Sequence, residues 1–150
     1  MSHHHLTVRV AFSAAHRLFN PDWDEARNRE VYAECAHPGG HGHNYVLEVT
    51  VAGTVDPATG MVINLKGLKR RVQDHVVAVV DHRDLNHDVP ELEGAIPTSE
   101  NLVALAWRLL AGRIPGATLH RLRLHETDRS FVTYYGPESG ETPPGRKESP

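Results

Sequence analysis

The hydrophobic period of the chain changes twice, and this change is the strongest constraint on its fold. Polar and apolar residues alternate in four stretches, as in half-buried strands. Between the second and third stretches the apolar residues recur every three or four positions, as in two amphipathic helices. The expected strands and helical stripes are, in order, 6–13, 45–51, 65–79, 102–110, 118–126 and 131–135. This ββααββ order predicts an α+β domain with a four-stranded antiparallel sheet and both helices on one face.

The two predicted helices and the helix-free face of the sheet differ in composition. The stripe of the first helix contains Leu65, Leu68, Val72, Val76 and Val79. Its basic side chains are interpreted as a solvated helix face. The second helix opens at 97–101, where Thr98 or Ser99 can cap it, and ends at 115–116. The helix-free face of the sheet is mixed, with Arg9, Glu48, Arg121 and Arg123, which favours a hydrated assembly interface.

Length and composition limit the possible classes of protein. The 150 residues suit a single domain, expected over 1–136, and the unpatterned end, 137–150, is expected to be disordered. A net charge of −3 gives no basic field, so we expect no nucleic-acid partner. No apolar run is typical of a membrane span or a signal peptide. The single cysteine suits a reducing compartment, and we expect a cytoplasmic protein.

The segment from Cys35 to Tyr45 carries the most chemistry. His41 and His43 are two positions apart at the start of a predicted strand, so they point to the same side. Two imidazoles on one side can hold one metal ion at about 2.0–2.1 Å. The same pattern also occurs in strands without a metal, so it needs further ligands.

His16, at the end of the first predicted strand, supplies a third imidazole. Three histidines with a fourth position left open form a typical catalytic zinc site, and we expect His16, His41 and His43 to bind Zn²⁺. Cys35 has several interpretations. As a fourth ligand it would close a structural site; unligated, it would be a base or nucleophile. A lone cysteine is also often simple packing.

Two acidic groups complete the candidate set. Asp81 can orient His82 for proton transfer, although neighbouring residues in a strand seldom bond side chain to side chain, so we expect a third group. Glu126 ends the third strand and could accept N–H donors from a heterocycle. The run His3–His5 is interpreted as a tag remnant or a frayed terminus and is excluded from the site.

Six ordered motifs resemble the 6-pyruvoyltetrahydropterin and 6-carboxytetrahydropterin synthases. The resemblance covers about residues 6–136. The motifs are Phe12-Ser-Ala-Ala-His16, Cys35-x5-His41-Gly-His43-Asn-Tyr, Gly60-Met-Val-Ile-Asn-Leu65, Val80-Asp-His82-Arg-Asp-Leu-Asn, Pro97-Thr-Ser-Glu-Asn101 and His125-Glu126-Thr-Asp. Any one of them is weak alone, whereas their order is specific.

The resemblance implies the tunnelling fold, in which three subunits close a barrel and two trimers form a homohexamer with sites between subunits. It implies a lyase that eliminates triphosphate from 7,8-dihydroneopterin triphosphate. The three histidines would bind zinc, Cys35 would be the base, and Asp81 with His82 would complete a proton relay. Glu126, Thr98 and Ser99 would bind the pterin.

The product remains open at the level of sequence. Five residues between Cys35 and His41 resemble the pyruvoyl-forming branch, whereas a shorter loop is common in the carboxy-forming branch of queuosine biosynthesis. A third branch, forming a hydroxymethyl pterin, carries glutamate in place of the cysteine; Glu34 adjoins Cys35, and this branch is disfavoured. The non-enzyme alternative is a zinc-bearing binding or structural module of the same fold.

Overall fold

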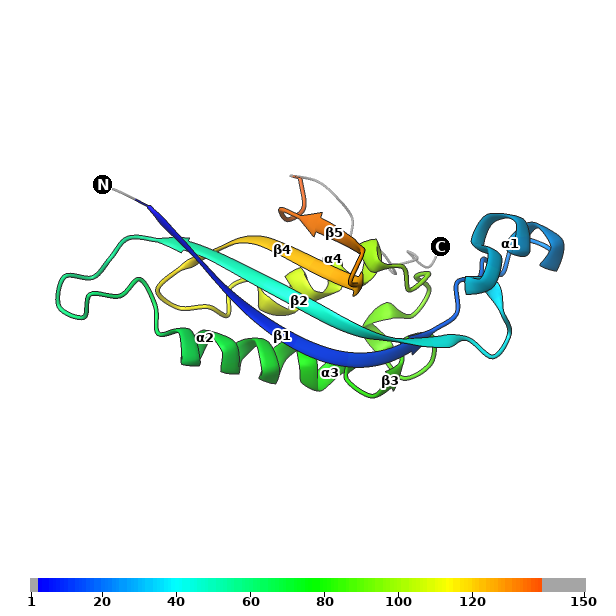
Figure 1. Ribbon diagram of the computed structural model, residues 1–150, viewed down its shortest axis with the longest axis horizontal. Helices are drawn as coiled ribbons and strands as arrows, with labels where there is room; N and C mark the ends of the chain where they lie inside the picture. The colour runs from blue at the N-terminus through cyan, green and yellow to red at the C-terminus, as the bar shows by residue number, and fades with distance from the viewer. Residues whose placement is uncertain (1–2, 139–150) are drawn as a thin grey trace, which may run out of the picture.

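A long twisted sheet with helices packed on one face forms the body of the molecule (Figure 1). The computed structural model describes residues 3–138. The strands are β1 (His4–His16), β2 (His41–Gly53), β3 (Arg83–Asp84), β4 (Thr118–Thr127) and β5 (Ser130–Tyr134). The helices are α1 (Glu25–Tyr32), α2 (Leu65–Val72), α3 (Ala78–Val80) and α4 (Ser99–Leu110), with 3₁₀ turns η1 (Ala33–Ala36) and η3 (Pro90–Leu92) and a π-helical segment η2 (Gln73–Val77). The predicted ββααββ core and α+β class are confirmed.

Strands β1 and β2 form the predicted antiparallel pair and are the longest strands of the described sheet. Their register runs without interruption from His4 opposite Gly53 to His16 opposite His41. The expectation of a frayed terminus was wrong for His4 and His5, which belong to β1. The ring of His5 stacks on that of His120 at 4.1 Å between centroids, and this contact holds the start of the strand.

The sheet has five strands in the order β3-β1-β2-β4-β5, so the prediction of four antiparallel strands was incomplete. The extra strand, β3, pairs parallel with β1 at Ala14 and Ala15. It has only two residues, which is too short to show any hydrophobic period.

The first predicted helix is continuous but changes its winding. Its buried residues are Leu68, Val72, Val76 and Val80, four positions apart, whereas Val79 is only partly buried. A strict spacing of four drifts around an α-helix of 3.6 residues per turn. The wider π turn of η2 compensates for the drift and keeps Val76 and Val80 toward the sheet.

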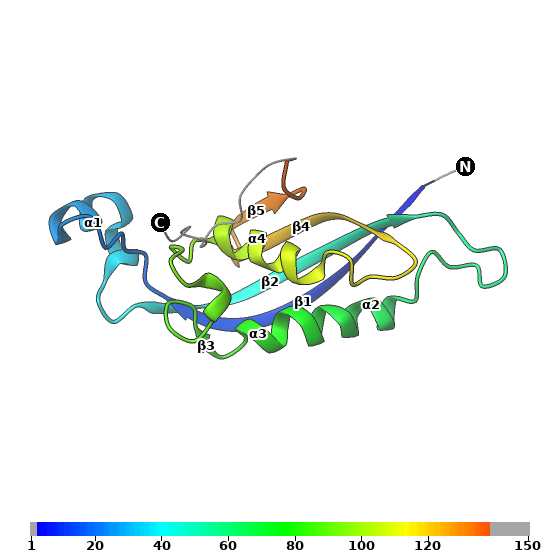
Figure 2. The ribbon, with the colours of Figure 1, turned by 180° about the vertical axis from the view of Figure 1, so that it is seen from behind.

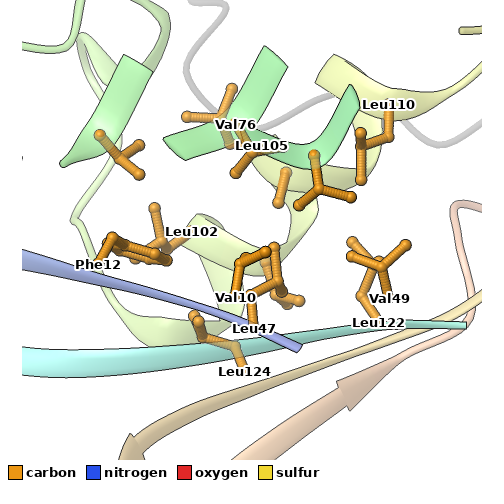
Figure 3. Close-up of a cluster of buried hydrophobic side chains, with 14 of the residues drawn as sticks. Val10, Phe12, Leu47, Val49, Val76, Leu102, Leu105, Leu110, Leu122 and Leu124 are labelled. Carbon is orange, nitrogen blue, oxygen red and sulfur yellow. The ribbon is translucent and has the colours of Figure 1, made fainter. Parts of the chain in front are cut away.

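The apolar core lies between the sheet and this helical layer (Figure 3). Alternate residues of β1, β2 and β4 meet the stripes of α2–α3 and α4 there, and Leu47, Leu68 and Leu110 have no exposed surface. The opposite face carries the expected mixed charges. The Glu48 carboxylate lies 3.6 Å from Arg9 Nε and 3.9 Å from Arg123 Nε.

The polar segment between β1 and the Cys35 loop contains a helix. Asp24 caps α1 by accepting a hydrogen bond from Arg27 N, and the buried Asn28 side chain bonds the backbone of Asn20 and Asp24. The pattern gave no helical signal because α1 has no apolar face. It lies beyond the end of the sheet (Figure 2), and η1, which carries Cys35, follows it directly.

The second predicted helix begins as expected and ends early. Thr98 caps α4, with its side chain accepting from Asn101 N, and the helix ends at Leu110, before the expected Pro115-Gly116 stop. The expected disordered tail lies, from residue 139 onward, outside the described residues. Within residues 3–138, no helix is long and apolar enough to cross a membrane.

Leu65 and Leu68 provide a test of the helix packing. Both belong to the predicted stripe, but Leu68 is fully buried and Leu65 is 46% exposed beside an apolar pocket. We expect Leu68→Ala to lower the free energy of unfolding by about 2–5 kcal/mol. Leu65→Ala, the matched control, should lower it by less than about 1 kcal/mol. Denaturant unfolding measures both, and equal losses would contradict this packing.

Candidate metal centre and active site

Three imidazoles converge at the paired ends of β1 and β2. The register sets His16 opposite His41, and His43 is two residues further along the same face of β2. One ligand nitrogen of each histidine lies within 4.8 Å of the others. His16 Nε2 and His41 Nε2 are 3.2 Å apart. Nitrogens around one tetrahedral Zn²⁺ would be separated by roughly 3.3 Å, so the cluster is close to the geometry of a three-histidine site.

The backbone carbonyl of Pro97 determines the tautomer of His16. His16 Nδ1 lies 2.8 Å from Pro97 O, and a carbonyl can only accept, so Nδ1 carries the proton. The neutral ring therefore presents the lone pair of Nε2 to the cluster. Metal-binding histidines commonly have such a partner on their second nitrogen.

Burial favours the neutral form of two histidines of this cluster. Desolvation lowers the pKa of His16, which is 1% exposed, and also lowers the pKa of His43. His43 Nε2 is buried and has no hydrogen-bond partner among the described residues. Its neighbour Glu126 Oε1 is 3.3 Å away, outside hydrogen-bond geometry. A neutral His16 and a neutral His43, the latter with a buried unpaired nitrogen, fit a zinc ion.

Glu126 lies beside the histidines and is joined to the start of α4. Ser99 Oγ donates to Glu126 Oε2 at 2.5 Å, while the other carboxylate oxygen faces His43. Tyr45, which is fully buried, packs against these rings, and its hydroxyl is 3.5 Å from His16 Nδ1. Burial raises the pKa of Tyr45, so it remains neutral.

Cys35 stands near the cluster but outside its three ligands. Burial raises the pKa of its thiol, and the nearby carboxylates of Glu126 and Glu34 raise it further. A thiol in this environment needs a positive charge or a proton acceptor beside it to ionise at neutral pH. The arrangement within the chain thus favours an unligated Cys35 over a closed structural site.

Asp81 and His82 form a separate pair at the edge of the sheet. Asp81 Oδ2 lies 2.9 Å from His82 Nδ1, and Asp81 Oδ1 accepts from Ser13 N at 2.9 Å. The expectation that the two side chains would not bond directly was wrong, because His82 adopts a positive φ of 57° that turns its ring back. Within residues 3–138, no hydrogen bond joins this pair to Cys35.

The structure thus gathers most of the predicted residues and separates two. His16, His41, His43, Glu126 and Ser99 meet in one place. The Thr98 side chain is used as the cap of α4, and Asp81 with His82 lies elsewhere. The Pro97 carbonyl was not anticipated, because a backbone oxygen gives no residue-type signal. The role of Tyr45 was also missed, although its place on the His41–His43 face of β2 could have indicated it.

The sequence of this chain is similar to known proteins over most of its length. Residues 5–137 match the family described as 6-pyruvoyl tetrahydropterin synthase. The chain belongs to this family. It is 42% identical over 132 residues to the 6-pyruvoyl tetrahydrobiopterin synthase of Poecilia reticulata, covering 88% of this chain and 90% of that protein. It is 39% identical over 128 residues to the Homo sapiens protein of the same name, covering 85% and 88%.

A solved relative supports the fold of this synthase family member. The structure of Caenorhabditis elegans 6-pyruvoyl tetrahydropterin synthase superposes with a TM-score of 0.85 at 36% identity, covering 91% of this chain and 98% of that one. The resemblance stated from the six motifs is confirmed, and with it the fold class.

Removal of any ligand should abolish tight metal binding. We expect His16→Ala, His41→Ala and His43→Ala each to bind zinc far more weakly than the unmodified chain, because two imidazoles cannot complete the site. His37→Ala is the matched control, since His37 is exposed and outside the cluster. Zinc content after dialysis measures the effect, and full zinc occupancy in any of the three variants would contradict the assignment.

Asp81 should make the stability of the protein depend on acidic pH. The hydrogen bond from Ser13 N, followed by that from His82, lowers the pKa of Asp81 below its usual 3.8. The ionised carboxylate thus stabilises the fold above about pH 4, and this contribution is lost as pH falls through the lowered pKa. We expect Asp81→Asn to lower Tm most at neutral pH and to lower it less at a pH below about 4. Thermal unfolding with a chelator present measures both; equal losses would contradict this account.

Proposed function

We propose that this chain is a zinc-dependent lyase that converts 7,8-dihydroneopterin triphosphate to 6-pyruvoyltetrahydropterin with loss of triphosphate. The observation that carries the proposal is the cluster of His16, His41 and His43, with Glu126 beside it, in a chain about two-fifths identical to pyruvoyl-forming synthases. Three imidazoles leave one coordination position for substrate, as catalytic zinc requires.

The residues around the cluster have distinct roles in this proposal. His16, His41 and His43 would hold Zn²⁺, which would supply Lewis acidity to the hydroxyls of the substrate side chain. Cys35 would remove a proton from the adjacent carbon as general base. Its thiol is not one of the three metal ligands and is an electrostatic neighbour of Glu126.

Glu126 would orient the pterin ring. Its carboxylate is half-buried and is held at one oxygen by Ser99, and such a fixed carboxylate can accept N–H donors from the guanidine-like edge of a pterin. Thr98 would contribute through its backbone and through the start of α4, because its side chain is used as the helix cap.

Asp81 and His82 would act on a neighbouring subunit. His82, which is bonded to Asp81, lines a pocket with Ser13, His43 and Asn44. The side chains of Ser13 and Asn44 belong to the helix-free face of the sheet, because they alternate with the core residues Phe12 and Tyr45. Cys35 is instead an electrostatic neighbour of Glu126, whose carboxylate accepts from Ser99 at the start of α4. A homohexamer of two stacked trimers would allow the relay pair of one chain to reach the cysteine of the next. The position of β5 at the end of the described strand order and the mixed helix-free face suit such an assembly.

The expected cellular context follows from the same chemistry. A base that works as a thiolate must remain reduced, and the chain has one cysteine, so we place the protein in the cytoplasm. The only partners in the proposal are the pterin triphosphate and further copies of the chain.

The test is to identify the product. We expect the zinc-loaded protein, incubated with 7,8-dihydroneopterin triphosphate, to give 6-pyruvoyltetrahydropterin and triphosphate, detected by mass spectrometry under anaerobic conditions. Release of acetaldehyde would instead indicate the 6-carboxytetrahydropterin branch. A substrate recovered unchanged would favour a binding module and would contradict the lyase assignment.

Cys35→Ala separates catalysis from binding in the same assay. We expect this variant to keep its zinc content and its affinity for the pterin while its kcat falls by about 10²–10⁴-fold, the usual contribution of a positioned base. Unchanged turnover would remove Cys35 from the mechanism. Loss of zinc would make Cys35 a ligand and favour a structural site.

A further inference from the structure

Two hydrogen bonds tie the backbone around Cys35 to the metal end of β1. Leu18 N donates to Cys35 O at 2.8 Å, and Arg17 Nε donates to Ala36 O at 2.9 Å. Both donors come directly after the ligand His16. Among the described residues, the other hydrogen bonds of 33–40 stay within the segment or reach α1. The position of Cys35 relative to the metal ligands therefore depends on Arg17 and Leu18.

The Asn86 side chain in turn holds Arg17 at two points. Asn86 Oδ1 accepts from Arg17 N at 2.7 Å, and Asn86 Nδ2 donates to Arg17 O at 2.9 Å. The parallel pairing of β1 with β3 ends just before this point, at Ala15 opposite Asp84. The Asn86 amide thus makes the two backbone hydrogen bonds that a residue of a longer β3 would make, and it makes them to Arg17, one residue beyond the end of β1.

Both ends of this connection are themselves fixed. Asn86 N donates to Asp84 Oδ1 at 2.9 Å, and Asp84 N donates to Asp88 Oδ2 at 3.0 Å, so the turn after β3 cannot rotate freely. At the other end, the guanidinium of Arg17 lies over the ring of Phe19 at 4.2 Å from its centroid. This stacking orients Nε toward the Ala36 carbonyl.

We propose that Asn86 is a positioning residue for the base Cys35 and acts through Arg17. The proposal rests on the proposed function, because it assumes that Cys35 transfers a proton. A base must lie within hydrogen-bond reach of its proton, and a displacement of about 1 Å can cost about 10²-fold in rate. The path from β3 through Asn86 and Arg17 to Ala36 is what keeps the η1 segment at that distance.

The chemistry of asparagine suggests an informative substitution. The amide accepts from Arg17 N through Oδ1 and donates to Arg17 O through Nδ2 at once, which a carboxylate of the same shape cannot do. Asn86→Asp has the same shape and keeps the accepting half, but it places a second acceptor against the Arg17 carbonyl. Asn86→Ala removes both halves. His87→Ala is the matched control, because His87 is in the same turn, its side chain is 79% exposed, and its described partner is Asp84.

The experiment combines kinetics with labelling of the single thiol of the chain. Zinc-loaded protein and variants are assayed with 7,8-dihydroneopterin triphosphate, and alkylation of Cys35 by iodoacetamide is followed by mass spectrometry. For Asn86→Ala we expect kcat to fall about tenfold or more, with KM within about twofold and zinc content unchanged. Cys35 should be alkylated several-fold faster because the segment is released. The kcat and the alkylation rate of Asn86→Asp should lie between those of Asn86→Ala and the unmodified chain. Both values for His87→Ala should match those of the unmodified chain.

Each other outcome has a definite meaning. Alkylation at the unmodified rate in both Asn86 variants would overturn the proposal, and so would loss of zinc, which would place the effect on His16. If Asn86→Ala does not fold, the isosteric Asn86→Asp carries the test with the same readouts. Faster alkylation with no turnover by the unmodified protein would uphold the positioning of Cys35 and overturn the proposed lyase.

Discussion

The antiparallel register of β1 and β2 is the constraint on which the candidate site depends. It places His16 directly opposite His41, and the two-residue repeat of a strand then adds His43 on the same face. The same alternation directs Val10, Leu47 and their neighbours into the core. One geometric rule therefore produces both the apolar layer and the metal ligands, so the ligands have the rigidity of a packed core rather than of a loop.

The start of α4 connects the helical layer to this chemistry. Three consecutive residues have different tasks there: the Pro97 carbonyl accepts from His16, Thr98 caps the helix, and Ser99 binds Glu126. The Thr98 cap defines where α4 begins. It therefore also determines where the Pro97 carbonyl, which sets the tautomer of His16, and the Ser99 hydroxyl lie. Stability of the helix and orientation of the site are set by the same turn.

Much of this could be predicted from the sequence, because periodicity and residue type carry it. The strands, the two core helices, the three histidines and Glu126 all follow from such signals. The remainder depends on features without a pattern. Strand β3 is too short, α1 has no apolar face, and the π turn of η2 moved burial from Val79 to Val80. The side-chain contact between Asp81 and His82 depends on the positive φ of His82, which the residue type does not indicate.

The chain reaches Cys35 through an excursion beyond the end of the sheet, and this has a consequence for how related enzymes can diverge. An inserted or deleted residue within β2 would move His41 or His43 to the opposite face and destroy the ligand set. A change of length before Gly40 leaves the strand pairing intact. The acid–base group can therefore be respaced or replaced during evolution while the metal ligands stay where they are, so one scaffold can acquire new products without rebuilding its centre.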